Sequence, residues 1–180
     1  MDPKKLIDKA KNGDKDAYGQ LYSEFYLPVF RYIYFRINQK EEAEDLTQTV
    51  FLKAYTSIER YQSRSVDPLA YFYTIARNVV IDYYRRKKEL SLESNLGQAM
   101  EIPDKKENIE ATFIQKENAE KVQQAISKLP LDQKEVIILK FINDLNNAEI
   151  ARLLGKNEAT IRQIQHRALK ALKGKIGDKT

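Results

Sequence analysis

Apolar residues recur at helical spacing along most of this 180-residue chain, and this pattern limits its fold more than any other feature of the sequence. In the clearest run, Ala17, Leu21, Phe25, Val29 and Ile33 follow one another at every fourth position. That spacing places side chains on one face of an α-helix, where they can be buried together. No segment shows the alternating apolar and polar residues, bounded by hairpin turns, that are typical of strands. The sequence therefore predicts an all-α protein.

Capping residues indicate where several helices begin. Asp2 with Pro3, and later Asp67 with Pro68, have the N-cap and first-turn residues of a helix start. Gly13 is expected to end the opening helix, because glycine adopts the left-handed conformation common at helix ends. A second, longer helix is expected to start near residue 14 or 16, and another to start at residue 67. The other expected helices cover residues 41–60, 110–128, 132–142, 147–154 and 158–173.

A polar, acidic stretch interrupts the helical pattern in the middle of the chain. Between Glu89 and Glu117 seven acidic residues face three lysines, although the whole chain carries a net charge of +5. From Ser91 to Asn108 the residues include Ser, Asn, Gly and Pro without a sustained apolar period, as expected for a linker. We therefore predict two helical domains, at 1–90 and 109–180, joined by a flexible acidic linker at 91–108.

The composition argues against several classes of function. The chain has no cysteine and a single histidine, His166, so thiolate metal sites, cysteine nucleophiles and a Ser-His-Asp triad are not expected. Neither GxGxxG nor a P-loop motif occurs, and no apolar stretch is long enough to span a membrane. We predict a cytoplasmic protein that is not an enzyme and has no catalytic residue, metal site, cofactor or small-molecule substrate. The net charge of +5 and a pI near 9.2 favour an anionic partner.

A helix-turn-helix pattern lies near the end of the chain. Asn146, with Glu149 three residues later, has the spacing of a capping box. The short helix that follows stops at Gly155, and Asn157 is placed to cap the next helix. A short helix, a glycine-containing turn and a second, basic helix are typical of proteins that bind duplex DNA. A structural helical hairpin has a similar pattern, so the faces of the second helix decide between the two.

The two faces of this second helix differ in chemistry. At about 100° per residue, Ile161 and Ile164 fall on one side, while Arg162, Gln163 and His166 fall on the other. Arginine, glutamine and histidine side chains can bind base edges and phosphates in a major groove. The helix has no acidic residue after its first position up to residue 173, so a DNA-reading face is favoured over a merely solvated one.

The predicted helix at 41–60 carries an apolar spot on its polar face. Asp45 and Gln48 lie opposite the buried stripe, yet Leu52 lies among them with Phe51 beside it. Such a spot favours docking against another protein, although single exposed leucines are also common. Acidic residues at the start of this helix complement the helix dipole, and we do not expect them to bind a metal.

The helix that begins near Asp67 combines basic and aromatic residues. Bases stack on aromatic rings and phosphates pair with cations, so this combination favours contact with single-stranded nucleic acid. The candidate side chains in this helix and the loop before it are Arg64, Tyr71, Tyr73, Arg77, Asn78 and Arg85.

Three stretches taken together resemble an extracytoplasmic-function (ECF, group IV) sigma factor of bacterial RNA polymerase, in the sigma-70 family. They are EDLTQTVFLKAY (Glu44 to Tyr55), YFYTIARNVVIDYYRR (Tyr71 to Arg86) and LNNAEIARLLGKNEATIRQIQHRALKAL (Leu145 to Leu172). The resemblance covers residues 16–90 and 118–175 and leaves the linker out. It implies a sigma region 2 helical bundle in the first domain and a sigma region 4 helix-turn-helix in the second.

The resemblance also implies contacts for individual residues. Docking on the β′ clamp helices of core polymerase would involve Asp45, Gln48, Phe51 and Leu52. Recognition and melting of the minus 10 promoter element would involve Arg64, Tyr71, Arg77 and Asn78. Duplex recognition of the minus 35 element would involve Arg162, Gln163 and His166, with Lys156 and Thr160 near phosphates. The β flap of polymerase and an anti-sigma factor are further partners expected on family grounds.

Departures from the family pattern keep promoter preference from being transferred. Family members usually carry Trp where Tyr71 stands and Gly where Ala159 stands, and Ile164 and Gln165 replace the usual Arg and Leu. The alternative interpretation is a free-standing helix-turn-helix regulator that binds duplex operator DNA without polymerase, usually as a symmetric dimer. Such a regulator does not need the apolar spot at Leu52, and this feature favours the sigma factor.

Overall fold

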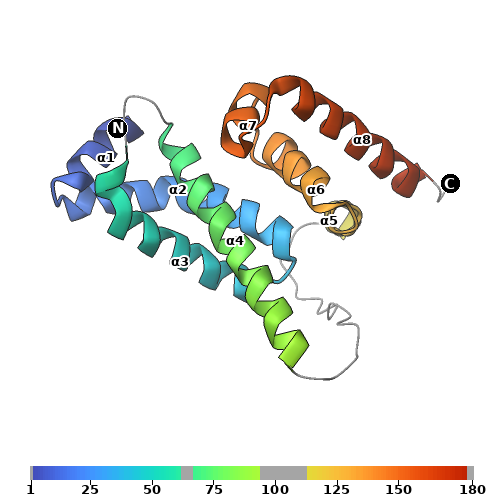
Figure 1. Ribbon diagram of the computed structural model, residues 1–180, viewed down its shortest axis with the longest axis horizontal. Coiled ribbons are helices and arrows are strands. Elements are labelled where there is room, and N and C mark those ends of the chain that lie inside the picture. The colour runs from blue at the N-terminus through green and yellow to red at the C-terminus, as the bar shows by residue number, and fades with distance from the viewer. Residues whose placement is uncertain (1, 62–66, 94–112, 178–180) are drawn as a thin grey trace.

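The computed structural model describes residues 2–61, 67–93 and 113–177, and these residues form two groups of helices (Figure 1). This confirms the predicted all-α class with two helical domains. Most of the predicted linker and the candidate Arg64 lie outside the described residues. None of the helices in the described ranges has the length and apolar character needed to cross a membrane. The elements are α1 Pro3–Lys11, α2 Lys15–Ile37, α3 Lys40–Ser57, η1 Ile58–Arg60, α4 Pro68–Glu93, α5 Phe113–Ser127, α6 Leu131–Ile137, η2 Ile138–Ile142, α7 Asn147–Leu154 and α8 Glu158–Gly177.

Aspartate side chains cap three helices of the first domain. Asp2 Oδ1 accepts a backbone N–H in the first turn of α1 at 3.0 Å, and Asp14 Oδ1 accepts one in α2 at 2.9 Å. Asp67 Oδ1 does the same for α4 at 2.9 Å. Each bond satisfies a donor that has no partner inside the helix. The helix starts predicted at these residues are therefore confirmed.

The apolar stripe of α2 lies at the centre of the first domain. Leu21 and Ile33 have no exposed surface, and Phe25 is 5% exposed, as the spacing predicts. The Phe25 ring lies 5.3 Å from that of Phe72 in α4, and Phe72 lies 5.0 Å from Phe51 in α3. These aromatic contacts join three helices into one core, because large rings bury the most apolar area per residue.

An irregular turn follows α6, where the sequence predicts one continuous α-helix at 132–142. The chain continues after Ile137 as a π-helix, η2, and the Asn143 amide donates to the carbonyl of Ile138 at 3.0 Å. Residues 136–139 are all buried apolar residues. A short apolar run of this kind has no period that distinguishes an α-helix from a wider turn. The prediction of a single α-helix is wrong at this point.

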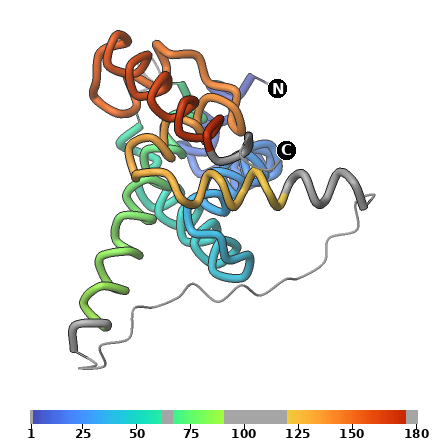
Figure 2. The backbone as a smooth tube through the Cα atoms, turned by 90° about the vertical axis from the view of Figure 1, so that its right-hand side faces the viewer, coloured from blue at the N-terminus to red at the C-terminus, as the bar shows by residue number. Residues whose placement is uncertain are grey.

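The second domain packs against α2 and α4 of the first (Figures 1 and 2). Asn143, directly after η2, donates from Nδ2 to the carbonyl of Pro28 in α2 at 2.8 Å. The same Nδ2 donates to the hydroxyl of Tyr73 in α4 at 2.8 Å. At the C-terminal end of α2, the side chain of Gln123 in α5 donates to the side chain of the capping residue Asn38. Segments distant in the sequence therefore hold the two domains side by side.

Candidate DNA and protein interfaces

A tight turn between α7 and α8 sets the angle of the helix-turn-helix. Asn146 Oδ1 accepts the Glu149 amide at 3.0 Å and Glu149 Oε2 accepts the Asn146 amide at 2.7 Å, which confirms the capping box. Gly155 ends α7 at φ 63°, a left-handed conformation that glycine adopts without strain. Asn157 then accepts the Thr160 amide at 2.8 Å and caps α8.

The two faces of α8 are separated as the sequence predicts. Ile161 and Ile164 are at most 3% exposed and belong to the core of the second domain. The opposite side chains are exposed and line one shallow hollow, which we call the α8 face: Arg162, Gln163, His166 and Arg167. Arg167 was not predicted, because helical periodicity places it at the edge of this face rather than at its centre.

Two further predicted residues lie at the start of α8. Lys156 is exposed in the turn, whereas Thr160 is half-buried. Arg162 Nη1 lies 3.5 Å from Glu158 Oε2, and both side chains are largely exposed. An exposed ion pair of this kind contributes little stability, so Arg162 is available to bind another anion.

One face of α3 presents an exposed leucine between polar residues. Asp45 and Gln48 are exposed, and Leu52 is 66% exposed. Phe51 is only 3% exposed, and its ring packs 4.6 Å from that of Tyr22. The expectation that Phe51 takes part in surface docking is therefore wrong, because the next residue along a helix is turned by about 100° and here points into the core.

Aromatic side chains extend this apolar area from α3 onto α2. Tyr55 is 41% exposed and its ring lies 4.8 Å from that of Tyr18. Tyr22 is 39% exposed and lies on the next turn of α2. In the sequence, aromatic residues occur at every fourth position from residue 18, and this spacing indicates an aromatic stripe along α2. We call the whole surface the docking face, and it consists of Asp45, Gln48, Leu52, Tyr55 and Tyr22.

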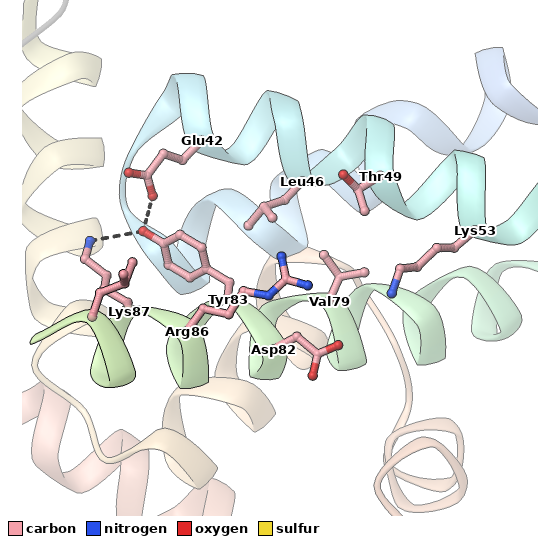
Figure 3. A pocket seen from close by; sticks show the side chains of 10 residues that line it. Glu42, Leu46, Thr49, Lys53, Val79, Asp82, Tyr83, Arg86 and Lys87 are labelled. Carbon is pink, nitrogen blue, oxygen red and sulfur yellow. Dashed lines mark hydrogen bonds between the residues drawn. The ribbon is translucent and has the colours of Figure 1, made fainter. Parts of the chain in front are cut away.

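A groove lies beside the docking face, between α3 and α4, with a volume of about 710 Å³ (Figure 3). Leu46 and Val79 line it from the two helices, and charged side chains surround them. The Tyr83 hydroxyl donates to Glu42 and accepts from Lys87 Nζ, which lies 3.1 Å away. Burial, together with the bond to Glu42, raises the pKa of Tyr83. Sequence reasoning missed this groove, because it depends on how two helices are paired.

The exposed side of α4 carries part of the predicted single-strand contact. Asn78 and Arg85 are exposed, and Arg85 pairs with Asp82 at 3.2 Å. Tyr71 is half-buried, and its hydroxyl lies 2.7 Å from Ser57 Oγ. Burial raises the pKa of Tyr71 above its ordinary value. We call Tyr71, Arg77, Asn78 and Arg85 the α4 face.

Two candidate residues of α4 are held by the second domain. Tyr73 is 1% exposed, so the expectation of an available stacking ring is wrong for this arrangement of the domains. Arg77 Nε donates to Glu135 Oε1 of α6 at 3.1 Å. The same carboxylate oxygen accepts from Arg36 Nη1 at 2.7 Å and from the Tyr32 hydroxyl at 2.8 Å. Glu135 thus joins three side chains of the first domain, and burial raises the pKa of Tyr32.

These features together define a two-domain helical protein with a helix-turn-helix in its second domain and exposed apolar side chains on α2 and α3 of its first. Comparison with known families agrees with this class. Sigma-70 region 2 matches residues 21–89, and Sigma-70 region 4 matches residues 119–172. The two matches fall on the two groups of helices.

Individual relatives give the same assignment. The chain is 34% identical to the ECF RNA polymerase sigma factor BldN of Streptomyces coelicolor, over 93% of this chain and 63% of BldN. It is 30% identical to the ECF RNA polymerase sigma factor SigW of Bacillus subtilis, over 97% of both chains. The solved sigma factor RpoE of Bartonella quintana, in complex with the anti-sigma factor NepR, shares the fold with a TM-score of 0.74 and 19% identity over 91% of this chain and 98% of RpoE. The chain belongs to the ECF sigma factors of the sigma-70 family, the alternative sigma factors that direct transcription initiation.

Proposed function

We propose that the docking face binds the β′ clamp helices of core RNA polymerase, while the α4 face and the α8 face bind the minus 10 and minus 35 promoter elements. The observation that carries this proposal is the exposure of the Leu52 side chain, which is 66% exposed within a polar helix face. Exposed apolar side chains rimmed by polar ones are typical of protein-docking sites. Tyr22 and Tyr55 add rigid aromatic area, which often supplies much of the binding energy at an interface.

The second domain has the features needed to read duplex DNA. The α8 face presents two arginines, a glutamine and a histidine, and the acidic side chain beside it, Glu158, forms only an exposed ion pair with Arg162. Arginine pairs with the acceptors of guanine, and glutamine with those of adenine, in the major groove. Lys156 in the preceding turn is placed to bind a phosphate, which adds affinity without sequence preference.

The first domain would capture unpaired bases of the minus 10 element. Asn78 can hydrogen-bond a base edge, while Arg77 and Arg85 can neutralise phosphates. The energy for melting comes from binding, because an unstacked base exchanges its duplex contacts for contacts with protein. The protein therefore acts as a non-enzymatic initiation factor in the bacterial cytoplasm, and polymerase performs the chemistry.

A second polymerase contact is proposed for the second domain. Leu131 and Phe141 are 64% and 53% exposed, on α6 and η2. They are candidates for the β flap contact, because they are large apolar side chains that the second domain leaves exposed. An anti-sigma factor is a further proposed partner, by analogy with the solved RpoE and NepR complex.

Reconstituted transcription tests the proposal. Core polymerase is mixed with fragmented genomic DNA, with or without the protein, and the 5′ ends of the transcripts are sequenced. We expect new start sites that share two upstream sequence elements and that appear only when the protein is added. A free-standing regulator predicts no new start sites with core polymerase alone, and predicts tight duplex binding by the protein without polymerase.

A further inference from the structure

The last residue of α1 binds the main chain at the point where η1 ends. Lys11 Nζ donates to the carbonyl of Tyr61 at 2.8 Å, and the two residues are 50 positions apart in the sequence. α1 also contacts η1 and α4. A hydrogen bond from a charged donor is stronger than one between neutral groups, so this bond helps to fix the position of Tyr61.

The side chain of Tyr61 in turn holds the ring of Tyr71. Tyr61 is 3% exposed, and its ring lies 5.2 Å from that of Tyr71 in an edge-to-face arrangement. The Tyr71 hydroxyl lies 2.7 Å from Ser57 Oγ and 3.3 Å from the carbonyl oxygen of Ala54. The ring and its polar end are therefore both held, although Tyr71 is only half-buried and part of its side chain stays accessible.

An aromatic ring held in one orientation is suited to stacking on an unpaired base. Stacking holds a base by its flat face, whichever base it is. A side chain that is ordered before binding loses little conformational freedom when the base arrives, so the affinity is higher. Tyr71 belongs to the α4 face, for which we propose the capture of unpaired minus 10 bases. The contacts that orient its ring therefore bear on that capture.

We propose that Lys11 is a positioning residue for the minus 10 contact: through Tyr61 it keeps the ring of Tyr71 in the orientation that stacks on an unpaired base. The proposal rests on the proposed role of the α4 face. It extends that role to α1, a helix that belongs neither to the two DNA-binding faces nor to the docking face. Lys11 itself does not touch DNA, so its effect depends on the presence of the Tyr71 ring.

Three substitutions separate positioning from a simple loss of charge. Lys11→Met keeps an aliphatic side chain but removes the ammonium group that donates to Tyr61. Lys11→Arg keeps a charged N–H donor and is expected to restore the behaviour of the wild type. The matched control is Lys9→Met, which removes the same charge from an exposed position of α1.

The mobility of the side chain at position 71 can be measured without polymerase, because the chain has no tryptophan of its own. Tyr71→Trp introduces a single tryptophan there in the full-length protein. Adding Lys11→Met is expected to lower the fluorescence anisotropy of this tryptophan and to increase its quenching by acrylamide, with unchanged helical circular dichroism. Adding Lys11→Arg or Lys9→Met should leave both signals unchanged. Equal signals with and without Lys11→Met would overturn the positioning role.

Binding of the holoenzyme to promoter DNA tests the consequence for function. The probe is a dye-labelled promoter fragment from the start-site experiment, with the non-template strand of the minus 10 element left unpaired. Lys11→Met is expected to weaken binding by about three- to tenfold, a part of the effect of losing one stacked base. Lys11→Arg and Lys9→Met should bind like the wild type.

A double-mutant cycle shows whether Lys11 acts through Tyr71. In a Tyr71→Leu background, Lys11→Met should have no further effect on binding, because the ring that it positions is gone. An equal loss with and without the Tyr71 ring, or no loss in either, would overturn the proposal. A failure of the proposed function would appear separately, as the absence of new start sites with the wild type, because the tryptophan measurement involves no polymerase.

Discussion

Leu52 and Phe51 are neighbours in the chain, but the turn of about 100° between them leaves Leu52 on the surface of α3 and places Phe51 in the core. Leu52 is 66% exposed on the docking face, whereas Phe51 is 3% exposed and contacts the rings of Tyr22 and Phe72 at 4.6 and 5.0 Å. Phe51 therefore supports the surface from beneath, and Leu52 is available to a partner. The two residues allow stability and partner binding to be tested separately.

Truncation of the buried Phe51 side chain should destabilise the fold. Phe51→Ala is expected to lower the free energy of unfolding by about 3 to 5 kcal/mol, because it leaves a cavity among three helices. Leu52→Ala should change it by no more than about 0.5 kcal/mol, since its side chain is mostly in water. Urea denaturation followed by circular dichroism measures both. Equal losses in the two variants would show that the assignment of their faces is wrong.

The turn of the helix-turn-helix should depend on glycine for conformational reasons alone. Gly155 has φ 63°, and a Cβ built on it meets no atom within 4 Å. Gly155→Ala should therefore cost about 1 to 2 kcal/mol, the price of a left-handed conformation. Gly19→Ala, in the interior of α2 and equally free of close neighbours, should instead stabilise by about 0.5 to 1 kcal/mol. Thermal unfolding of both variants checks the opposite signs.

Arg162 is expected to affect which minus 35 sequences the protein prefers. Arg162→Ala should weaken binding of the holoenzyme to its selected promoter by about 1 to 3 kcal/mol and relax the preference at one or two positions. Arg31→Ala removes the same charge from an exposed position of α2 and is the control. Selection from a library with a randomised minus 35 element measures the effect. An unchanged preference would exclude Arg162 as a base-reading residue.

Lys156 should act differently, through a phosphate. Lys156→Ala is expected to weaken promoter binding to a similar extent for all sequences and to reduce the slope of log affinity against log salt concentration by about 1. The measurement is a series of binding titrations at increasing salt. A change in sequence preference with an unchanged slope would assign Lys156 to a base instead.

The features that could be predicted from sequence are those fixed by local interactions. The caps at Asp2, Asp14 and Asp67 and the capping box at Asn146 depend on residues a few positions apart. The buried and exposed sides of α8 follow from helical periodicity, and Ile161 and Arg162 lie as expected. The family resemblance added the assignment of the domains to sigma regions 2 and 4, which the comparisons confirm.

The features that were missed depend on contacts between distant segments. Phe51 and Tyr73 have side chains that could face either water or protein, and their burial is decided by α2, α4 and the second domain. The π-helix after Ile137 follows an apolar run without a distinguishing period. The bonds from Glu135 to Arg36 and Arg77 join residues far apart in the sequence, and a single sequence gives no signal for such pairs.

The most direct test of the account is co-purification of the tagged protein with bacterial core RNA polymerase, comparing the wild type with Leu52→Glu. Leu27→Glu is the matched control, because it places the same charge at a leucine that is 51% exposed on α2. We predict stoichiometric recovery of polymerase with the wild type and with Leu27→Glu, and its loss with a folded Leu52→Glu. Full recovery of polymerase with Leu52→Glu would contradict the docking face, and no recovery with the wild type would contradict the proposed function.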